Sequence, residues 1–120
     1  MTDTVSNLRH AFDAIEDLWH PRPLVRINDY AVKAVKVQGE FVWHSHSATD
    51  ELFVVLRGEL HIDLRDAEGE RRVTLGPDDL YVIPRGVEHR PVSEAGAEIL
   101  LLEPEDTVNT GDVVPDPDAV

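Results

Sequence analysis

Two histidines and a carboxylate in the stretch HSHSATDELFVVLRG have the types and the spacing that metal binding needs. His44 and His46 are two residues apart, so on a strand their side chains share one face with Cα atoms roughly 7 Å apart. Two imidazoles at this distance can bind the same ion. Glu51 follows the polar turn SATD and starts a run of β-formers, from which its carboxylate would add an oxygen ligand. The stretch predicts a metal site built on strands, with one alternative: a shift of one residue in register would turn Asp50 inward in place of Glu51.

The fourth ligand is expected to be His89. In VIPRGVEH a strand is followed by a turn with proline and glycine that directs the next side chain back to the interior. His10 and His20 flank a predicted helix, and His61 lies on the polar face of ELHIDL. We therefore expect these three histidines on the surface and leave them out of the site.

The first twenty residues are expected to form one amphipathic helix that packs on the rest of the chain. The segment SNLRHAFDAIEDLWHPRP begins with two candidate N-caps, Ser6 and Asn7, and ends at two prolines. Between them, apolar residues recur at helical spacing: Leu8, Phe12, Ile15 and Trp19.

From residue 21 to residue 105 the sequence changes to short valine-rich runs in which apolar and polar residues alternate. Turn signals such as ND, QGE and DAEGE separate these runs. Short strands at such intervals, with one helix, are typical of an all-β barrel or sandwich and not of alternating βαβ units. We expect a single all-β domain over residues 21–105.

Residues 106–120 are expected to form an acidic, partly mobile tail. From Glu103 onward the sequence has acidic residues and three prolines but no basic residue, which is typical of a solvated segment. The stretch DTVNTGD, at the start of this tail, is rich in turn formers and could instead pack back on the barrel.

Composition excludes several classes of protein. The 120 residues, 42% of them hydrophobic, suit one domain with one core. Because cysteine is absent, a metal site must use histidine and carboxylate, and a reducing compartment is compatible. The N-terminus has no leader pattern and no stretch reaches the length of a membrane span, so we expect a soluble, cytoplasmic protein. The net charge of -13 opposes binding to nucleic acid.

Two motifs in this sequence resemble those of small single-domain cupins. The first motif of that family runs glycine, five residues, His-x-His, three or four residues, glutamate, six residues and glycine. It is matched here, with four residues in place of the first five, by Gly39, His44, His46, Glu51 and Gly58. KVQGEFVWHSH and the later VNTGD also resemble stand-alone cupins that are labelled uncharacterised or sugar-isomerase-like.

The second cupin motif runs glycine, five residues, Pro-x-Gly, two residues, histidine, three residues and asparagine. It is matched by Pro84, Gly86 and His89. Asp78 stands at its first glycine, where a residue that tolerates a left-handed turn is needed, and Ser93 stands at its asparagine. The turn details therefore differ, but all four ligands of the family are present.

The resemblance implies a jelly-roll-like β-barrel of six to eight strands over about residues 24–102. It also implies one divalent transition metal per chain, which would be iron, manganese, nickel or zinc, inside the barrel. The ligands of this metal would be His44, His46, Glu51 and His89.

Around this site the alternation of strand residues predicts a mostly apolar cavity. Phe53 and Val55 share the face of Glu51 and would line the cavity. Arg85, Glu88 and Arg90 are placed where they could orient a substrate at the barrel mouth, but for each of them we favour the role of a solvated turn residue.

Three functions fit these residues. The first is a metalloenzyme acting on a small oxygenated organic molecule, as a dioxygenase, isomerase or lyase, because three imidazoles and one carboxylate leave exchangeable positions on the ion. The second is a small-molecule or sugar-binding barrel in which the metal is structural, and the third is a metal-free interaction protein. We favour the first. We also expect a homodimer, because the strand faces and the helix offer apolar surface to a partner.

Overall fold

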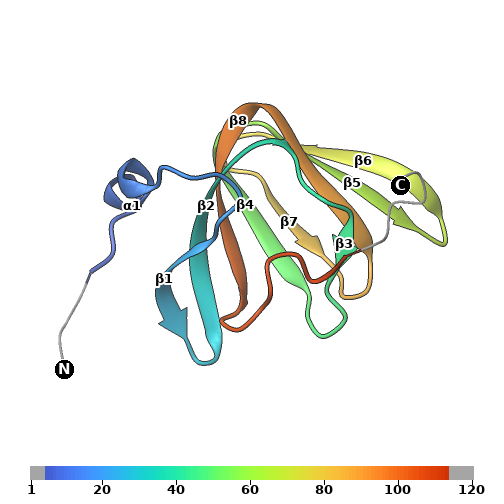
Figure 1. The fold of residues 1–120 in the computed structure, drawn as a ribbon, viewed down its shortest axis with the longest axis horizontal. Coiled ribbons are helices and arrows are strands. Elements are labelled where there is room, and N and C mark those ends of the chain that lie inside the picture. Colours follow the sequence, from blue (N-terminus) through green and yellow to red (C-terminus); the bar gives the residue numbers. More distant parts are fainter. Residues whose placement is uncertain (1–4, 114–120) are drawn as a thin grey trace.

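The computed structural model describes residues 5–113, which form one short helix and an antiparallel sheet that bends over itself (Figure 1). The helix α1 is Leu8–Ala14, and the strands are β1 Arg22–Ile27, β2 Tyr30–Glu40, β3 His44–Ser45, β4 Glu51–Gly58, β5 Leu60–Asp66, β6 Gly69–Leu75, β7 Leu80–Ile83, β8 Glu88–Pro104 and β9 Asp112–Val113. The prediction of an all-β fold with one short N-terminal helix is confirmed.

Strand β8 belongs to both halves of this sheet. In the first half, residues 97–104 of β8 pair with β2 on one side and β4 on the other, and β1 and β7 form the edges. In the second half, residues 88–93 pair with β5 and β3, beyond which lie β6 and β9. Between them β8 curves over the top of the molecule in Figure 1, with Gly96 at a φ of +100°. This bend turns the two halves toward each other as a jelly-roll-like barrel.

The core between the two halves follows from the alternation of strand residues. On β4, Phe53 and Val55 point inward and are 3% and 0% exposed. On β5 every second residue is buried, and His61 lies on the opposite, outer face, as predicted. Apolar residues of both halves meet in one cluster, so a single core holds the barrel together.

Helix α1 is shorter than the sequence predicted. Asn7 is its N-cap and accepts a hydrogen bond from the backbone N–H of His10 at 3.0 Å. The helix ends before Ile15, which already has extended backbone angles. Phe12 and Ile15 are both buried against the outer face of the first half. The apolar side of the helix is thus used within the chain.

Trp19 does not continue the helix. It lies in a bend at a φ of +59°, which costs a non-glycine residue about 1–2 kcal/mol. Tertiary contacts hold it there: its backbone N–H donates to Lys36 O at 2.8 Å, and its ring stacks on Phe41 with centroids 4.9 Å apart. Helical spacing is a local signal, and these distant contacts override it.

The segment after β8 packs back on the barrel, as the turn formers of DTVNTGD suggested. The backbone N–H of Glu105 donates to Asp29 O at 2.9 Å, and β9 pairs with β3. Glu103, which the sequence placed with the acidic residues of the tail, is instead a buried residue of β8. Residues 114–120, the end of the predicted mobile tail, lie outside the described residues.

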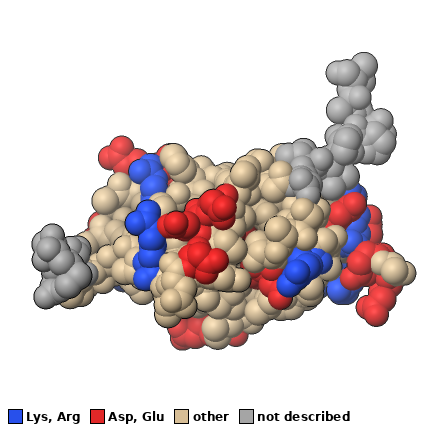
Figure 2. Space-filling model, turned by 90° about the horizontal axis from the view of Figure 1, so that it is seen from below, with Lys and Arg blue, Asp and Glu red and all other residues tan. Residues whose placement is uncertain are grey.

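Acidic and basic side chains lie next to each other on the face of the molecule shown in Figure 2. Exposed pairs include Arg22 with Asp17 at 2.9 Å and Arg57 with Glu98 at 3.8 Å. Such pairs contribute at most about 1 kcal/mol each, so the fold depends on its core. Within residues 5–113, no helix has the length and apolar character that crossing a membrane requires.

Candidate metal centre

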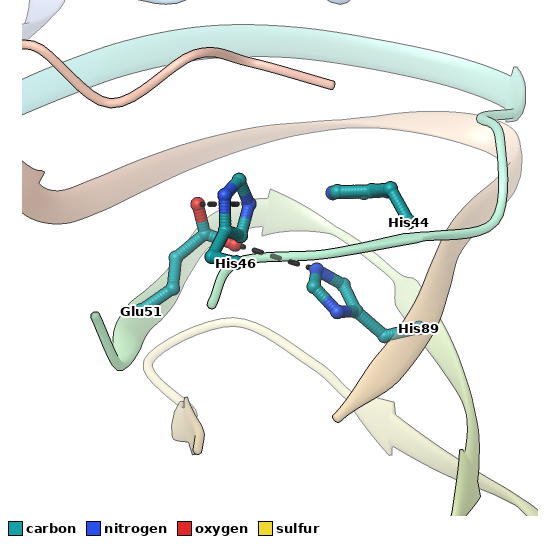
Figure 3. Close-up of side chains that lie close together, drawn as sticks. All are labelled: His44, His46, Glu51 and His89. Carbon is teal, nitrogen blue, oxygen red and sulfur yellow. Dashed lines mark ion pairs between the residues drawn. The ribbon is translucent and has the colours of Figure 1, made fainter. Parts of the chain in front are cut away.

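Four buried side chains from separate parts of the sequence meet inside the barrel (Figure 3). They are His44, His46, Glu51 and His89, and one ligand atom of each lies within 4.8 Å of the others. His44 is on β3 and His46 follows that strand, while Glu51 begins β4 and His89 lies near the start of β8. The structure brings together the four residues that the sequence singled out, from three strands and the loop between β3 and β4.

Strand pairing sets the positions of the imidazole rings. His44 on β3 pairs directly with His89 on β8, and their ring centroids are 4.2 Å apart. The ring of His46 lies 5.1 Å from that of His44 and is nearly perpendicular to it, at 85°. Gly111 makes room for His46, because a Cβ at this glycine would lie 2.8 Å from His46 Nδ1 and 2.2 Å from the backbone oxygen of Ser45.

Two hydrogen bonds determine which nitrogen of two imidazoles can bind a metal. His44 Nδ1 lies 2.8 Å from the carbonyl oxygen of Val42, and His89 Nδ1 lies 3.0 Å from that of Val87. Since a carbonyl only accepts, each Nδ1 carries the proton and each Nε2 keeps its lone pair. Backbone partners of this kind are typical of ligand histidines. His89 Nε2 itself is buried and has no hydrogen-bond partner among the described residues.

Burial keeps these two imidazoles neutral. Removal from water, with a further effect of the neighbouring His89, lowers the pKa of His44 to about 4. Burial also lowers the pKa of His89. The neutral imidazole is the form that binds a metal, so near pH 7 both lone pairs are available.

Glu51 faces the histidines with both of its oxygens. Oε2 lies 3.5 Å from His46 Nε2, and Oε1 lies 3.5 Å from His89 Nε2. Behind Glu51, the Lys33 ammonium donates to Glu103 Oε1 at 3.0 Å, and all of these side chains are buried. The candidate ligand is therefore backed by a buried ion pair.

The carboxyl groups of Glu51 and Glu103 influence each other's ionisation inside the barrel. Burial, and then the contact with Glu51, raise the pKa of Glu103 to about 8, so this group holds the proton near neutral pH. Burial raises the pKa of Glu51 as well, although its contact with Glu103 and the charge of Lys33 act in the opposite direction. The carboxylate is the form that would bind a metal.

The donor set fits a first-row divalent ion. Bonds from imidazole nitrogen and carboxylate oxygen to such ions are about 2.1 Å long, so ligand atoms around one ion lie up to about 4.2 Å apart. The four ligand atoms, within 4.8 Å of one another, need only a small inward movement to reach this spacing. The same ligand types suit several first-row ions, so the donor set alone selects none of them.

Two cavities flank the four residues. One, of about 310 Å³, is lined by His46 and by polar residues that include Ser45, Ser47, Thr49, Asp106 and Thr107. The other lies inside the barrel, where His44 and Glu51 bound it. Its remaining walls are mostly apolar and include Val35, Val37, Phe41, Phe53, Ile99 and Leu101. The predicted apolar cavity is thus present and Phe53 lines it, whereas Val55 packs in the core and is not one of its walls.

The choice between Asp50 and Glu51 is settled by burial and hydrogen bonding. Glu51 is 4% exposed, whereas Asp50 lies at the surface and accepts a hydrogen bond from the backbone N–H of Arg85 at 2.8 Å. The register of β4 therefore turns Glu51 inward.

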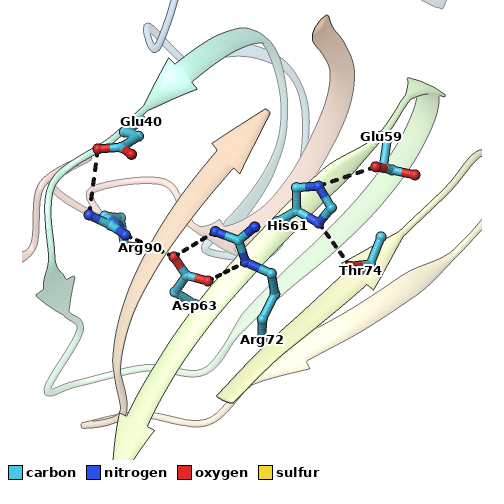
Figure 4. Close-up of polar contacts among 7 residues, drawn as sticks. All are labelled: Glu40, Glu59, His61, Asp63, Arg72, Thr74 and Arg90. Carbon is cyan, nitrogen blue, oxygen red and sulfur yellow. Dashed lines mark hydrogen bonds and ion pairs between the residues drawn. The ribbon is translucent and has the colours of Figure 1, made fainter. Parts of the chain in front are cut away.

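The residues that could orient a substrate at the barrel mouth do not face the interior. Because residues of β8 alternate, Glu88 and Arg90 lie on the outer face on either side of His89. Arg90 pairs with Asp63 at 3.0 Å (Figure 4), and Glu88 pairs with Arg65. The guanidinium of Arg85 is exposed near Asp50. These contacts fit the solvated role that the sequence favoured for each of the three residues.

Sequence reasoning missed Lys33 and Glu103. A signal for Lys33 was available: on β2 it alternates with Ala31 and Val35, which places a charged residue on the core face, where it needs an acidic partner. The partner lies 70 residues away on β8, and only the pairing of β2 with β8 brings the two together.

A folded-over antiparallel sheet with three histidines and one glutamate converging inside it defines a β-barrel protein with a candidate metal centre. The family described as cupin domain matches residues 31–103, so the chain belongs to the cupin family. The four converging residues belong to the two motifs noted in the sequence: three to the first motif and His89 to the second. The resemblance drawn from those motifs is confirmed.

Relatives of known sequence or structure support the same assignment. Uncharacterized protein YdbB of Bacillus subtilis (strain 168) is 44% identical over 77 residues, which are 64% of this chain and 66%, just under two thirds, of that protein. A cupin-2 domain containing protein from Shewanella frigidimarina NCIMB 400 has a TM-score of 0.79 and 44% identity, covering 84% of this chain and 95% of that one. Protein NMB1881 from Neisseria meningitidis has a TM-score of 0.75 and 28% identity, covering 85% and 100%. Hydroquinone 1,2-dioxygenase from Sphingomonas sp. TTNP3, at 24% identity and a TM-score of 0.74 over 82% of this chain and 31% of that one, shares the fold alone.

Proposed function

We propose that this chain is a metal-binding cupin that works as a metalloenzyme on a small oxygenated organic molecule, by dioxygenation, isomerisation or elimination. The observation that carries this proposal is the convergence of four buried ligand atoms within 4.8 Å, with the Nε2 atoms of two imidazoles left unprotonated. Burying so many polar groups in an apolar core is costly, and an ion that binds all four would offset the cost.

One divalent transition metal, whether iron, manganese, nickel or zinc, would be held by His44, His46, Glu51 and His89. When bound, it would supply a Lewis-acidic centre with exchangeable positions for an oxygen-bearing substrate. The chain itself does the rest. Glu103 lies behind Glu51 and pairs with Lys33, whose ammonium balances negative charge there, and the apolar walls exclude water from the organic part of the substrate.

A second function, binding without turnover, is favoured by the lining of the two cavities. Among the described residues, the interior cavity is bounded by no acid or base beyond the proposed ligands. The open cavity beside His46 is lined by hydroxyl groups, which suit a polyhydroxylated molecule such as a sugar. In that case the metal would be structural.

Elemental analysis of untagged protein tests the metal site. We expect about one equivalent of a single transition metal per chain in the wild type and its loss in His46→Ala. His61→Ala is the matched control, because this histidine lies on the outer face and should leave the metal content unchanged. A wild-type protein that holds little metal, even after reconstitution with iron, manganese, nickel and zinc in turn, would contradict the proposal.

Turnover separates the two functions. Metal-loaded protein is screened against small hydroxylated and carboxylated molecules, with oxygen consumption and product formation as readouts. A rate that disappears on chelation and in His44→Ala supports the enzyme. Saturable binding of a sugar with unchanged substrate, in protein that holds its metal, supports the binding barrel.

We also propose that the protein is a cytoplasmic homodimer. The location is a prediction from the sequence alone. The dimer is supported by apolar residues that stay accessible on edge strands of the first half of the sheet: Val25, Ile27, Leu80 and Val82.

A further inference from the structure

The interior cavity beside the candidate metal centre is nearly filled by the protein itself. Only about 20 Å³ of it is free, which is space for about one water molecule. A ligand the size of benzene needs about 150 Å³. Any organic ligand that reaches the inner side of His44 and Glu51 therefore requires that a side chain in the cavity wall moves.

Trp19 is the wall residue best placed to move. Apart from Phe41, the other apolar side chains that line the cavity belong to strands or lie within β8, whereas Trp19 lies in the bend between α1 and β1. Moving it breaks no strand pairing. Its φ of +59° is in a region that residues with a side chain rarely adopt, so leaving this conformation relieves strain.

Three hydrogen bonds hold Trp19 in the cavity wall. Its backbone N–H donates to Lys36 O at 2.8 Å, and its indole Nε1 donates to Gln38 O at 3.0 Å. The side chain of Asn109, 90 residues away in the C-terminal segment, donates from Nδ2 to Trp19 O at 2.8 Å. The closed position therefore depends on a small number of bonds, one of which comes from a side chain that can be replaced.

The position of the indole indicates which ligand would fit in its place. The indole stacks on Phe41 with centroids 4.9 Å apart and planes inclined by 20°, so the cavity accepts a flat ring against this face. The polar groups of the cavity lie at its end with His44 and Glu51, and the other walls are mostly apolar. A sugar would bury several hydroxyl groups against these walls without partners. A planar apolar ring with one oxygen at its end satisfies both features.

We propose that Trp19 is an internal plug of a binding site for small phenols. A phenol displaces the indole, stacks on Phe41 and directs its oxygen toward His44 and Glu51. The direction of the oxygen rests on the proposed function, because it requires a metal on the four ligands. The displacement of Trp19 by a flat ring does not require the metal.

The fluorescence of Trp19 tests the displacement. The chain has two tryptophans, so Trp43→Phe leaves Trp19 as the only one. Trp43 lies under the Arg65 guanidinium, 4.1 Å from its ring centroid, and does not line the cavity. Phenol is titrated into this variant, in the metal-free and zinc-loaded forms, with excitation where phenol does not absorb. We expect a saturable red shift as the indole enters water. Cyclohexanol, which has the hydroxyl group but no flat ring, should give none.

Calorimetry of two further variants tests the energetics. Trp19→Ala removes the plug. Phenol should then bind about tenfold more tightly, because the cavity is open in every molecule. Asn109→Ala removes one hydrogen bond from the closed position and should tighten binding about fivefold, which keeps the proposal testable if Trp19→Ala does not fold. Leu18→Ala is the control, since this neighbour of Trp19 is exposed and should leave the affinity unchanged.

The outcomes for the plug and for the proposed function are distinct. Absence of a saturable shift with phenol, or weaker binding by Trp19→Ala and Asn109→Ala, overturns the plug even if the protein holds one equivalent of metal. A shift in protein that cannot be loaded with metal supports the plug and rejects the metal centre. A shift that cyclohexanol reproduces overturns the assignment to flat rings.

Discussion

Glu51 and Glu103 are two carboxyl groups in contact, and Lys33 lies close enough to balance the charge of one of them. Two full negative charges beside one positive charge are unfavourable in a buried site, so the pair keeps one proton near neutral pH. With a pKa of about 8, Glu103 holds this proton, beside Glu51, whose oxygens face the histidines. The buried trio therefore sets the charge of the candidate metal centre.

The stability of the metal-free protein should depend on pH through Glu103. Its pKa is about 8 in the folded protein, above the 4.5 of a solvated glutamate. Within this window the folded state holds a proton that the unfolded state releases, so the free energy of unfolding falls as pH rises. His44 and His89 act in the opposite direction near pH 6.5, because their folded pKa values are lowered and the unfolded state still binds protons there. We expect a net fall of about 1 kcal/mol from pH 6.5 to 8.

Urea unfolding of metal-free protein at these two pH values checks this expectation. Glu103→Gln should remove the fall, because the amide still accepts from Lys33 but does not titrate. Glu94→Gln makes the same chemical change at an exposed position of β8 and should keep the wild-type slope. An equal slope in Glu103→Gln would show that another group titrates.

The four candidate ligands could be found from the sequence, whereas the residues that support them could not. His44 and His46 are two residues apart, so alternation places them on one face, and Glu51 begins the next strand. The sequence does not determine whether Asp50 or Glu51 turns inward. In the structure Glu51 is the buried one. Glu103 was assigned to a solvated tail because its neighbours are acidic, while its partner on β2 is 70 residues away.

At the scale of elements, the turn after β4 decides whether two strands can pack. Gly58 ends β4 at a φ of +82° and lies opposite Ala97 of β8. A Cβ at Gly58 would lie 2.2 Å from the backbone oxygen of Gly96 and 2.9 Å from Ala97 Cα, and neither backbone atom can move without distorting β8. Glycine is needed here for its backbone angle and also for the close approach of the strands.

Gly58→Ala and Gly39→Ala should therefore differ in cost. Gly39 has nearly the same φ, +85°, but no atom lies within 4 Å of the position its Cβ would take. Gly39→Ala should lower the free energy of unfolding by about 1 kcal/mol, from the backbone angle alone. Gly58→Ala should cost at least about 3 kcal/mol, because strain and steric overlap add. Chemical denaturation measures both, and equal losses would mean that the strands can separate slightly at no cost.

Elements with a regular alternation were predictable, and the end of the helix was not. Strand β5 alternates apolar and polar residues in the sequence, and its burial follows this alternation. The helix was expected to reach Trp19 because its spacing fits, but the indole gains more from Phe41 and Gln38 than from another helical turn. Those partners lie on the barrel, and local pattern contains no information about them.

At the scale of the whole molecule, a row of apolar side chains crosses the outer face of the first half of the sheet. Cross-strand partners share a face, and the register joins residues of all five strands of this half. From edge to edge the row runs Val25, Val32, Leu102, Leu52 and Val82. Helix α1 packs on a neighbouring part of this face, beside Ala34 and Leu100, and leaves the row accessible. The sequence led us to expect that the helix offers apolar surface to a partner. In the structure this row is the apolar surface that stays accessible.

A row of this kind suits a second copy of the same chain, because a twofold axis can place one row on the other. Light scattering during size-exclusion chromatography should give twice the monomer mass of 13.4 kDa. The double variant Val25→Lys and Val82→Lys places charges at both ends of the row, so it should elute as a folded monomer with its metal content unchanged. Val42→Lys is the control, since Val42 is 42% exposed, close to the 44% of Val25, but lies outside the row. A wild-type mass of one chain, or a double variant that stays dimeric, would show that this face is not where two copies meet.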